Sequence, residues 1–318
     1  MHLSPKFSAI REAQQILLGY FGQTPLLRTK SLDQRNASVY LKNEAVLPTG
    51  SFKPRGALYA LTCNAKRRPI EEVAASSTGN HGAAVAFAAK TLRIKATIFL
   101  PENANPIKRK KIQELGARVI ETGSSDLAEA FASAKEYSNR PGIYFLNDAT
   151  DPDLPAGPAT IGLEILDQLP GITAAFVPMG DTALIRGIGA ALKHCAPAVK
   201  IVGVQAERAP SYYLSWQQGN AVPTETCDTC ADGLATRTPE PENVASIREV
   251  VDEVALVTEE QMLDAIRHLK QKEGLLAEPA GAAATAAFLN HGPPSGQIVL
   301  LVTGRNISDA LRRQIGIS

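Results

Sequence analysis

The chain has 318 residues, a formal net charge of +1 and 44% hydrophobic residues. This length can bury a large core and predicts two domains, or one domain with a large lobe. The composition excludes a disordered chain, and the small net charge argues against bulk electrostatic binding to nucleic acid. No apolar run reaches membrane-spanning length and no signal-peptide pattern opens the chain, so we predict a cytoplasmic protein that does not enter membranes.

Short runs rich in β-forming residues alternate with helical patterns along the chain. The first half reads as strand 39–44, a helix after Lys53, strand 72–77, helix 83–92, strand 95–101, helix 106–117, strand 118–122, helix 126–138 and strand 142–147. The second half reads as strand 174–180, helix 183–195, strand 200–205, a helix from a Thr258–Gln261 capping box to Lys272, and strand 297–304. This order predicts an α/β fold of parallel-rich sheets flanked by helices.

Three strand ends carry small or hydroxyl-bearing residues, at 76–82, 180–184 and 303–306. In parallel sheets, ligands bind beyond the carboxyl ends of the strands. Small residues permit close approach of the backbone, and hydroxyl groups supply hydrogen-bond donors. We therefore expect these three segments to form a ligand site.

The stretch "LPTGSFKPRGA" places Lys53 directly before a proline. Proline suits the first helical position and restrains the preceding residue from helical backbone angles. The positive end of the helix dipole should then lower the pKa of the Lys53 amine, which would make this side chain a candidate imine-forming group. A solvated lysine at a helix start is the equally weighted alternative for this stretch.

The four cysteines, Cys63, Cys195, Cys227 and Cys230, do not form a metal-binding pattern, because the single "CDTC" pair has no second pair. We interpret Cys227 and Cys230 as reduced, non-catalytic thiols. The five histidines lack ligand spacing as well, so no metal site is predicted.

Five motifs together resemble the fold-type II pyridoxal-phosphate (PLP) enzymes, above all the serine/threonine dehydratases and serine racemase. They are "TGSFKPRGA", "SSTGNHG", "VPMGDTAL", "EPAGA" and "VTGRN", and they occur in the family's order. The resemblance runs from 22–27 to 302–306, and no C-terminal regulatory domain is expected. It implies a large cofactor domain of residues 1–50 and 148–318 and a small domain of residues 51–147, with the cofactor in the cleft between them.

The resemblance also assigns roles to individual residues. Lys53 matches the Schiff-base lysine that later moves the Cα proton, and Phe52 matches a residue that packs near the cofactor ring. Asn80 matches the asparagine that bonds the cofactor's phenolic oxygen, and Thr303 matches the hydroxyl residue that faces the pyridine nitrogen. The loop expected to hold the substrate carboxylate comprises Ser77, Thr78, Gly79, Asn80 and His81. The phosphate loop comprises Gly180, Asp181, Thr182, Ala183 and Leu184. Glu278 is assigned to support of the site.

Three departures from the family pattern bear on function. Asp181 puts a carboxylate where the family's phosphate loop has glycine, so we expect its side chain to point away from the phosphate or to pair with a cation such as Arg186. Gln205 and Ser211 replace the acidic residues of the racemase metal site, so that site is expected to be lost. Thr78 retains a hydroxyl at the position that distinguishes racemases from dehydratases, which leaves racemisation open.

The activity that the resemblance implies is PLP-dependent deamination of a β-hydroxy amino acid, such as L-threonine or L-serine, to a 2-oxo acid and ammonia. A hydroxyl at position 303 does not keep the pyridine nitrogen protonated, which favours elimination over transamination. Lys53 and Thr78 are the predicted catalytic residues. The alternatives are a serine-type racemase, a β-replacement synthase and a catalytically silent PLP-binding protein. A small amino acid is the predicted partner, and a homodimer is the predicted assembly.

Overall fold

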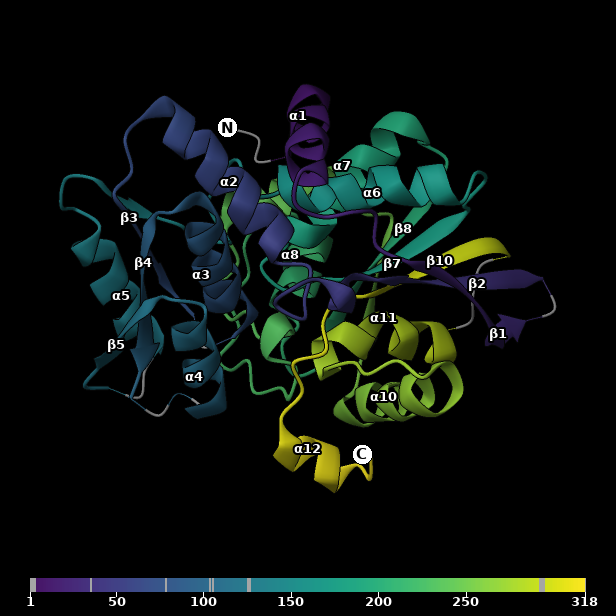
Figure 1. The fold of residues 1–318 in the computed structure, drawn as a ribbon. Coiled ribbons are helices and arrows are strands. Elements are labelled where there is room, and N and C mark those ends of the chain that lie inside the picture. Colours follow the sequence, from purple (N-terminus) through teal and green to yellow (C-terminus); the bar gives the residue numbers. More distant parts are fainter. Residues whose placement is uncertain are drawn as a thin grey trace.

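A computed structural model describes residues 4–34, 36–77, 79–102, 104, 106–124, 127–291 and 295–317 of the chain. Its described strands form two sheets, one of six strands in the order β1-β2-β10-β7-β8-β9 and one of four in the order β5-β4-β3-β6. Figure 1 shows the two sheets side by side, each covered by helices. The α/β class and the parallel-rich sheets predicted from the sequence are confirmed.

The six-stranded sheet is parallel except for the antiparallel pair of β1 and β2 at one edge. Its strands are β1 (Leu26–Gln34), β2 (Ala37–Asn43), β7 (Ala174–Pro178), β8 (Lys200–Ala206), β9 (Glu253–Val257) and β10 (Gly296–Val302). Strand β1 was not predicted, because this edge strand is mostly exposed and its sequence "LLRTKSLDQ" lacks a continuous apolar run. The central strands β7, β8 and β10 are apolar and buried, as expected of a parallel sheet with both faces covered.

Helices cover both faces of this sheet, as Figure 1 shows for α10 and α11 below it and α6 and α7 above it. The helices of this part are α1 (Phe7–Leu18), α6 (Ala156–Gln168), α7 (Ala183–Cys195), α8 (Ser211–Gln218), α9 (Pro241–Val250), α10 (Glu259–Glu273), α11 (Pro279–Asn290) and α12 (Asp309–Gln314), with short 3₁₀ turns η1 (Glu44–Val46) and η2 (Asp232–Leu234). Alternate strand residues pack in opposite cores: Phe176 lies in the core with Phe288 of α11, whereas Val177 lies in the core with Ile188 of α7. The predicted capping box of Thr258 and Gln261 is present at the start of α10.

The four-stranded sheet is parallel throughout its described pairs. It comprises β3 (Glu72–Ser76), β4 (Lys95–Pro101), β5 (Arg118–Thr122) and β6 (Ile143–Phe145), and it is flanked by α2 (Pro54–Arg67), α3 (Asn80–Leu92), α4 (Pro106–Glu114) and α5 (Leu127–Tyr137). All four strands fall inside residues 51–147. Helix α3 begins three residues before the predicted start at 83, and α4 ends before the predicted 117. The predicted domain boundaries themselves stay a prediction.

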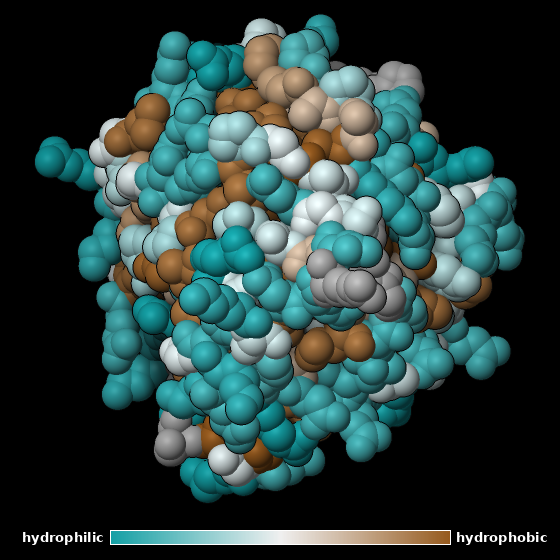
Figure 2. Space-filling view, turned by 90° about the vertical axis from the view of Figure 1, so that its right-hand side faces the viewer, coloured by the Kyte–Doolittle hydropathy of each residue, from teal (hydrophilic) through white to brown (hydrophobic). Residues whose placement is uncertain are grey.

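Figure 2 shows one face of the molecule, on which hydrophilic residues predominate and hydrophobic residues form several separate groups. Among the described residues, no helix combines the length and the apolar character that crossing a membrane requires.

Candidate active site

A cavity of about 460 Å³ lies where strand ends of both sheets meet. Its wall includes Ser76 at the end of β3, Pro178 at the end of β7 and Thr303 just after β10. All three segments that the sequence marked as ligand-binding strand ends therefore contribute to one cavity. Lys53, next to the N-terminus of α2, also lines it.

The chain just before Lys53 is attached to the end of β10. The Phe52 N–H donates to the Thr303 carbonyl at 3.0 Å, and Ser51 forms an antiparallel bridge with Gly304. Lys53 itself has helical backbone angles (φ −54°, ψ −31°), which differs from the restraint expected before Pro54. The Lys53 carbonyl accepts the Ala57 N–H at 3.2 Å, so one helical hydrogen bond offsets the steric cost of this conformation.

The Lys53 amine forms an ion pair that the sequence analysis missed. Its Nζ lies 2.5 Å from Oδ2 of Asp148, and both side chains are about one-fifth exposed. Asp148 follows β6, so it also sits beyond the carboxyl end of a parallel strand. From the sequence we selected only strand ends with small or hydroxyl-bearing residues, which Leu146, Asn147 and Asp148 are not, and Asp148 belongs to none of the family motifs that we matched.

The prediction of a lowered pKa for Lys53 is wrong. Burial acts to lower the pKa of the amine, but the carboxylates of Asp148, Asp181 and Glu278 outweigh this effect and raise the pKa above its ordinary value. Burial acts to raise the pKa of Asp148, but its neighbours His81 and Lys53, together with the hydrogen bond from Lys53, hold this pKa well below its usual range. The free Lys53 side chain is therefore an ammonium group.

A chain of hydrogen-bonded side chains also lines the cavity. Asn80 Nδ2 donates to Glu278 Oε1, and Asn306 Nδ2 donates to Asn80 Oδ1, each at 2.6 Å. Lys111 Nζ donates to Asn306 Oδ1 at 2.7 Å and to the Thr49 carbonyl at 2.8 Å. Asn80 thus lies in the cavity, and its hydrogen bonds with Glu278 and Asn306 orient its amide.

The segment predicted as a phosphate loop joins β7 to the N-terminus of α7. All five of its residues, Gly180 to Leu184, line the cavity. A Cβ atom at Gly180 would collide with the carbonyl oxygen of Gly233, so this position requires glycine. Thr182 has a positive φ of 68°, a conformation that costs a β-branched residue about 1–3 kcal/mol. The N–H groups in the first turn of α7 lie at the end of the helix that borders the cavity. A helix N-terminus favours a bound anion.

Asp181 does not point into solvent: it lines the cavity, and its Oδ1 accepts a hydrogen bond from Thr236 Oγ1 at 2.9 Å. Burial and then repulsion from Asp148 raise the pKa of its carboxyl to about 6. The positive charges of Lys53 and Arg186 act in the opposite direction. Arg186 Nε donates to Thr182 Oγ1 at 3.0 Å, so a cation does lie behind this loop, as the sequence analysis suggested.

Of the predicted substrate loop, Ser77, Gly79, Asn80 and His81 line the cavity, and Thr78 lies outside the described residues. Ser77 Oγ accepts the Gly79 N–H at 3.2 Å. His81 is buried in the first turn of α3, and its Nε2 donates to the Leu146 carbonyl at 3.0 Å. The cavity therefore brings the described part of this loop to the same space as Lys53.

Phe52 and Thr303, which the motifs assigned to the surroundings of a cofactor ring, also line the cavity. The Lys53 ammonium lies 5.7 Å from the centre of the Phe52 ring. Thr303 is buried at the end of β10, and its Oγ1 is 3.5 Å from the Ala280 carbonyl. Both residues line the cavity, so the groups predicted to surround a cofactor ring share one space with the lysine.

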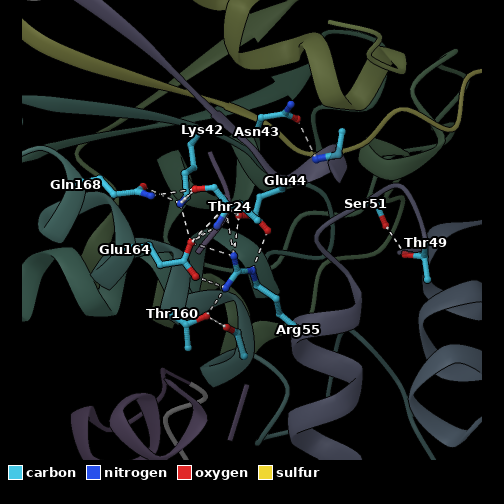
Figure 3. A network of polar contacts seen from close by, with 12 residues as sticks. Thr24, Lys42, Asn43, Glu44, Thr49, Ser51, Arg55, Thr160, Glu164 and Gln168 are labelled. Carbon is cyan, nitrogen blue, oxygen red and sulfur yellow. Dashed lines mark hydrogen bonds and ion pairs between the residues drawn. The ribbon is translucent and has the colours of Figure 1, made fainter. Parts of the chain in front are cut away.

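A buried charge network holds the N-terminus of α2 to the larger sheet and to α6 (Figure 3). Arg55 donates to both oxygens of Glu44, at 2.8 and 3.0 Å, and to Glu164 at 2.6 and 3.1 Å. Lys42 Nζ lies 2.6 Å from Glu164, and Thr24 contributes its hydroxyl to Glu44. The network fixes Arg55, and because Arg55 is only two residues from Lys53, it also helps to position the lysine.

Among the described residues, no group of three or more His, Cys, Asp and Glu side chains could hold a metal ion. Gln205 Oε1 accepts the Tyr213 N–H, and Ser211 Oγ donates to the Thr236 carbonyl. Cys230 lines the cavity, where burial and the neighbouring Glu259 raise the pKa of its thiol to about 12. This pKa disfavours the reactive thiolate form.

Residues 17–304 match the family of pyridoxal-phosphate dependent enzymes, and the chain belongs to this family. It is 37% identical to an L-threonine ammonia-lyase of Geobacter sulfurreducens over 95% of this chain and 75% of that protein. The structure of maize serine racemase superimposes with a TM-score of 0.92 at 27% identity, covering 98% of this chain and 96% of that one. The processed form of threonine deaminase isoform 2 from Solanum lycopersicum superimposes with a TM-score of 0.89 at 28% identity, covering 98% and 89%.

These similarities confirm the predicted family, the PLP cofactor and the enzyme class, a PLP-dependent lyase. The residues in the cavity fit this cofactor. Lys53 supplies the amine, the first turn of α7 supplies N–H groups for a phosphate, and Thr303 supplies a hydroxyl. The Asp181 carboxylate would repel a phosphate dianion. The hydrogen bond from Thr236 and the positive charges of Lys53 and Arg186 reduce this repulsion.

Proposed function

We propose that this protein is an ammonia-lyase that converts a β-hydroxy amino acid, such as L-threonine or L-serine, to a 2-oxo acid and ammonia. The observation that carries the proposal is that Lys53 and Thr303 line the same cavity. Lys53 would be the base, and Thr303 offers a hydroxyl group, not a carboxylate, at the position assigned to the pyridine nitrogen. The similarity to an L-threonine ammonia-lyase and to a threonine deaminase supports the same activity.

PLP, when bound, supplies the electron sink that permits cleavage at Cα and Cβ of an amino acid. In this proposal Lys53 would hold the cofactor through its amine and would act as the base that takes the Cα proton on Nζ. Ser77 and the peptide N–H groups of residues 77–81 bind the substrate carboxylate, and the N–H groups of residues 182–184 bind the phosphate. Glu278 and Asn306 hold the Asn80 amide in place, and in this proposal Asn80 would bond the cofactor's phenolic oxygen. Thr78 is our candidate to protonate the departing β-hydroxyl.

A panel of L- and D-β-hydroxy amino acids, scored both for 2-oxo acid and for the opposite enantiomer, tests the proposal. We expect 2-oxo acid from an L-substrate as the dominant product. Formation of the enantiomer without 2-oxo acid would establish a racemase, the activity named for the maize structure. A product that carries an added nucleophile would establish a β-replacement synthase, and retention of PLP without turnover would establish a silent binding protein.

We also propose that the protein acts in the cytoplasm as a homodimer. The proposal for the dimer rests on the resemblance to the family, and the proposal for the compartment on the sequence expectation. Sedimentation of the purified holoenzyme at micromolar concentration tests the assembly, and a monomer at that concentration would contradict it.

A further inference from the structure

Asp148 occupies a distinctive place in the cavity, because it contacts the one amine on which the proposed chemistry depends. Its Oδ2 lies 2.5 Å from Lys53 Nζ and 3.7 Å from His81 Nδ1. It comes from the loop after β6 in the smaller sheet, whereas the chain before Lys53 is attached to β10 in the larger sheet. The ion pair therefore joins the two halves of the molecule at the reacting group.

His81 does not compete with Lys53 as the cation that balances Asp148. A carbonyl oxygen can only accept, so the 3.0 Å contact with the Leu146 carbonyl requires the hydrogen to be on Nε2. Burial lowers the pKa of His81, which keeps the ring neutral and leaves Nδ1 without a hydrogen on the side of Asp148. Lys53 is then the cation in direct contact with the Asp148 carboxylate among the described residues.

The other carboxylates that act on Lys53 are differently engaged. Asp181 accepts a hydrogen bond from Thr236, and Glu278 accepts one from Asn80. Both carboxylates raise the pKa of Lys53 through their charge, whereas Asp148 also forms a hydrogen bond with the amine. Asp148 is thus the group that can fix both the position and the protonation of the amine.

We propose that Asp148 is a positioning residue that aims the Lys53 amine and strengthens it as a base. The inference deepens the proposed function and rests on the role of Lys53 as proton acceptor. In the step concerned, Lys53 would take the proton of the substrate Cα–H bond as a new N–H bond, and the electron pair left at Cα would need the electron sink that PLP supplies when bound. The resulting ammonium is stabilised by the Asp148 carboxylate, which holds its charge without itself taking the proton.

The test measures the protonation of Lys53 in protein freed of cofactor, so it needs no turnover. Acetic anhydride acetylates neutral amines, and peptide mass spectrometry gives the rate at Lys53 as a function of pH. In Asp148→Asn we expect the midpoint of this rate to move to lower pH, with at least about fivefold faster labelling at pH 8, because the adjacent negative charge is lost. Asp148→Glu keeps the charge and should restore the wild-type midpoint. Asp153→Asn, which removes a carboxylate paired with Arg67, is the matched control and should leave the midpoint unchanged.

An unchanged Lys53 midpoint in a folded Asp148→Asn variant would overturn the proposal. The wild type provides a second measurement that does not depend on the variant's folding: its Lys53 midpoint should lie above that of Lys110, whose side chain is 77% exposed. A Lys53 midpoint at or below that of Lys110 would also overturn the proposal. A shifted midpoint in Asp148→Asn supports it even where the amino-acid panel yields no 2-oxo acid, so the two proposals fail separately.

Discussion

Among single residues, the pKa of the Lys53 amine depends more on the nearby carboxylates than on the position of Lys53 at the start of a helix. A helix dipole contributes about 0.3–1 kcal/mol at an exposed terminus. A carboxylate in contact with the amine inside a partly buried cavity acts through a much larger Coulomb energy. Asp148 supplies that contact at 2.5 Å, which is why the pKa of the amine rises where the helix alone would lower it.

Replacing Lys53 tests its role directly. We expect Lys53→Ala to abolish turnover and to remove the cofactor that borohydride reduction attaches to the protein, because both the anchoring amine and the base are lost. Lys53→Arg is the matched control for folding, since it keeps a cation beside Asp148 but not a nucleophilic amine. Deamination by Lys53→Ala at the wild-type rate would contradict the assignment.

Asp181 makes the stability of the cofactor-free protein depend on pH. Its carboxyl has a pKa raised from 3.8 to about 6 in the folded state, so the folded state binds a proton more tightly than the unfolded state. Below about pH 4 Asp181 does not change the free energy of unfolding, because its carboxyl is protonated in both states. Above pH 6 its ionisation lowers the free energy of unfolding by up to about 3 kcal/mol. Asp181→Asn should therefore be more stable than wild type at pH 7.5 and equally stable near pH 4, as urea unfolding at the two pH values will show. The same stability difference between variant and wild type at both pH values would show that the charge of Asp181 is not its cause.

The same variant addresses the phosphate loop. With the Asp181 carboxylate bonded to Thr236 and influenced by two cations, we expect Asp181→Asn to change cofactor affinity by less than about tenfold, or roughly 1.4 kcal/mol. Fluorescence titration of cofactor-free protein with PLP measures this affinity. Tightening by several hundredfold would mean that the repulsion is unrelieved, and would favour the silent binding protein.

At the scale of elements, α2 depends on its N-terminal anchor more than on its C-terminal ion pair. Arg55, in the first turn, is fully buried between Glu44 and Glu164, whereas Arg67, in the last turn, pairs with Asp153 at the surface with 59% of its side chain exposed. Removing one partner of a buried pair leaves an uncompensated charge, while an exposed pair contributes little.

These two arginines form a matched pair of variants. We expect Arg55→Met to lower the free energy of unfolding by about 3–5 kcal/mol, because Glu44 and Glu164 lose their main cation. Arg67→Met should change it by less than about 1 kcal/mol. Urea unfolding followed by circular dichroism measures both, and similar losses in the two variants would show that the buried network does not anchor the helix.

At the scale of the whole molecule, the cavity is formed by strand ends of two sheets, so a ligand in it contacts both halves. Binding to the folded state alone stabilises a protein by an amount set by ligand concentration and affinity. No comparable contribution is expected from a divalent metal, because Gln205 and Ser211 stand where the resemblance predicts acidic ligands, and both side chains bond to protein groups.

We therefore expect PLP at 100 times its dissociation constant to stabilise the cofactor-free protein by about 2.7 kcal/mol. Exhaustive treatment with a chelator should leave the activity and the thermal midpoint of the holoenzyme nearly unchanged. Differential scanning fluorimetry measures both effects. A large loss on chelation that magnesium or calcium restores would show that the metal site is retained.

The class of fold, the family and many of the residues that line the cavity could be predicted from the sequence alone. Local patterns were sufficient, because a buried parallel strand is a short apolar run and because Lys53, Asn80, the loop 180–184 and Thr303 each belong to a recognisable motif. Strand β1 escaped this reasoning, since an exposed edge strand has no such pattern.

The electrostatics of the site could be read only from the folded chain. Asp148 lies 95 positions from Lys53 in sequence and meets it because β6 and β10 end at the same cavity. Likewise, Thr236 reaches Asp181 from a segment 55 positions away. Proton affinities depend on distance and burial, which a linear pattern does not encode. For this reason the motifs pointed to Lys53, which lines the cavity, whereas the carboxylate in contact with its amine emerged only when the chain was folded.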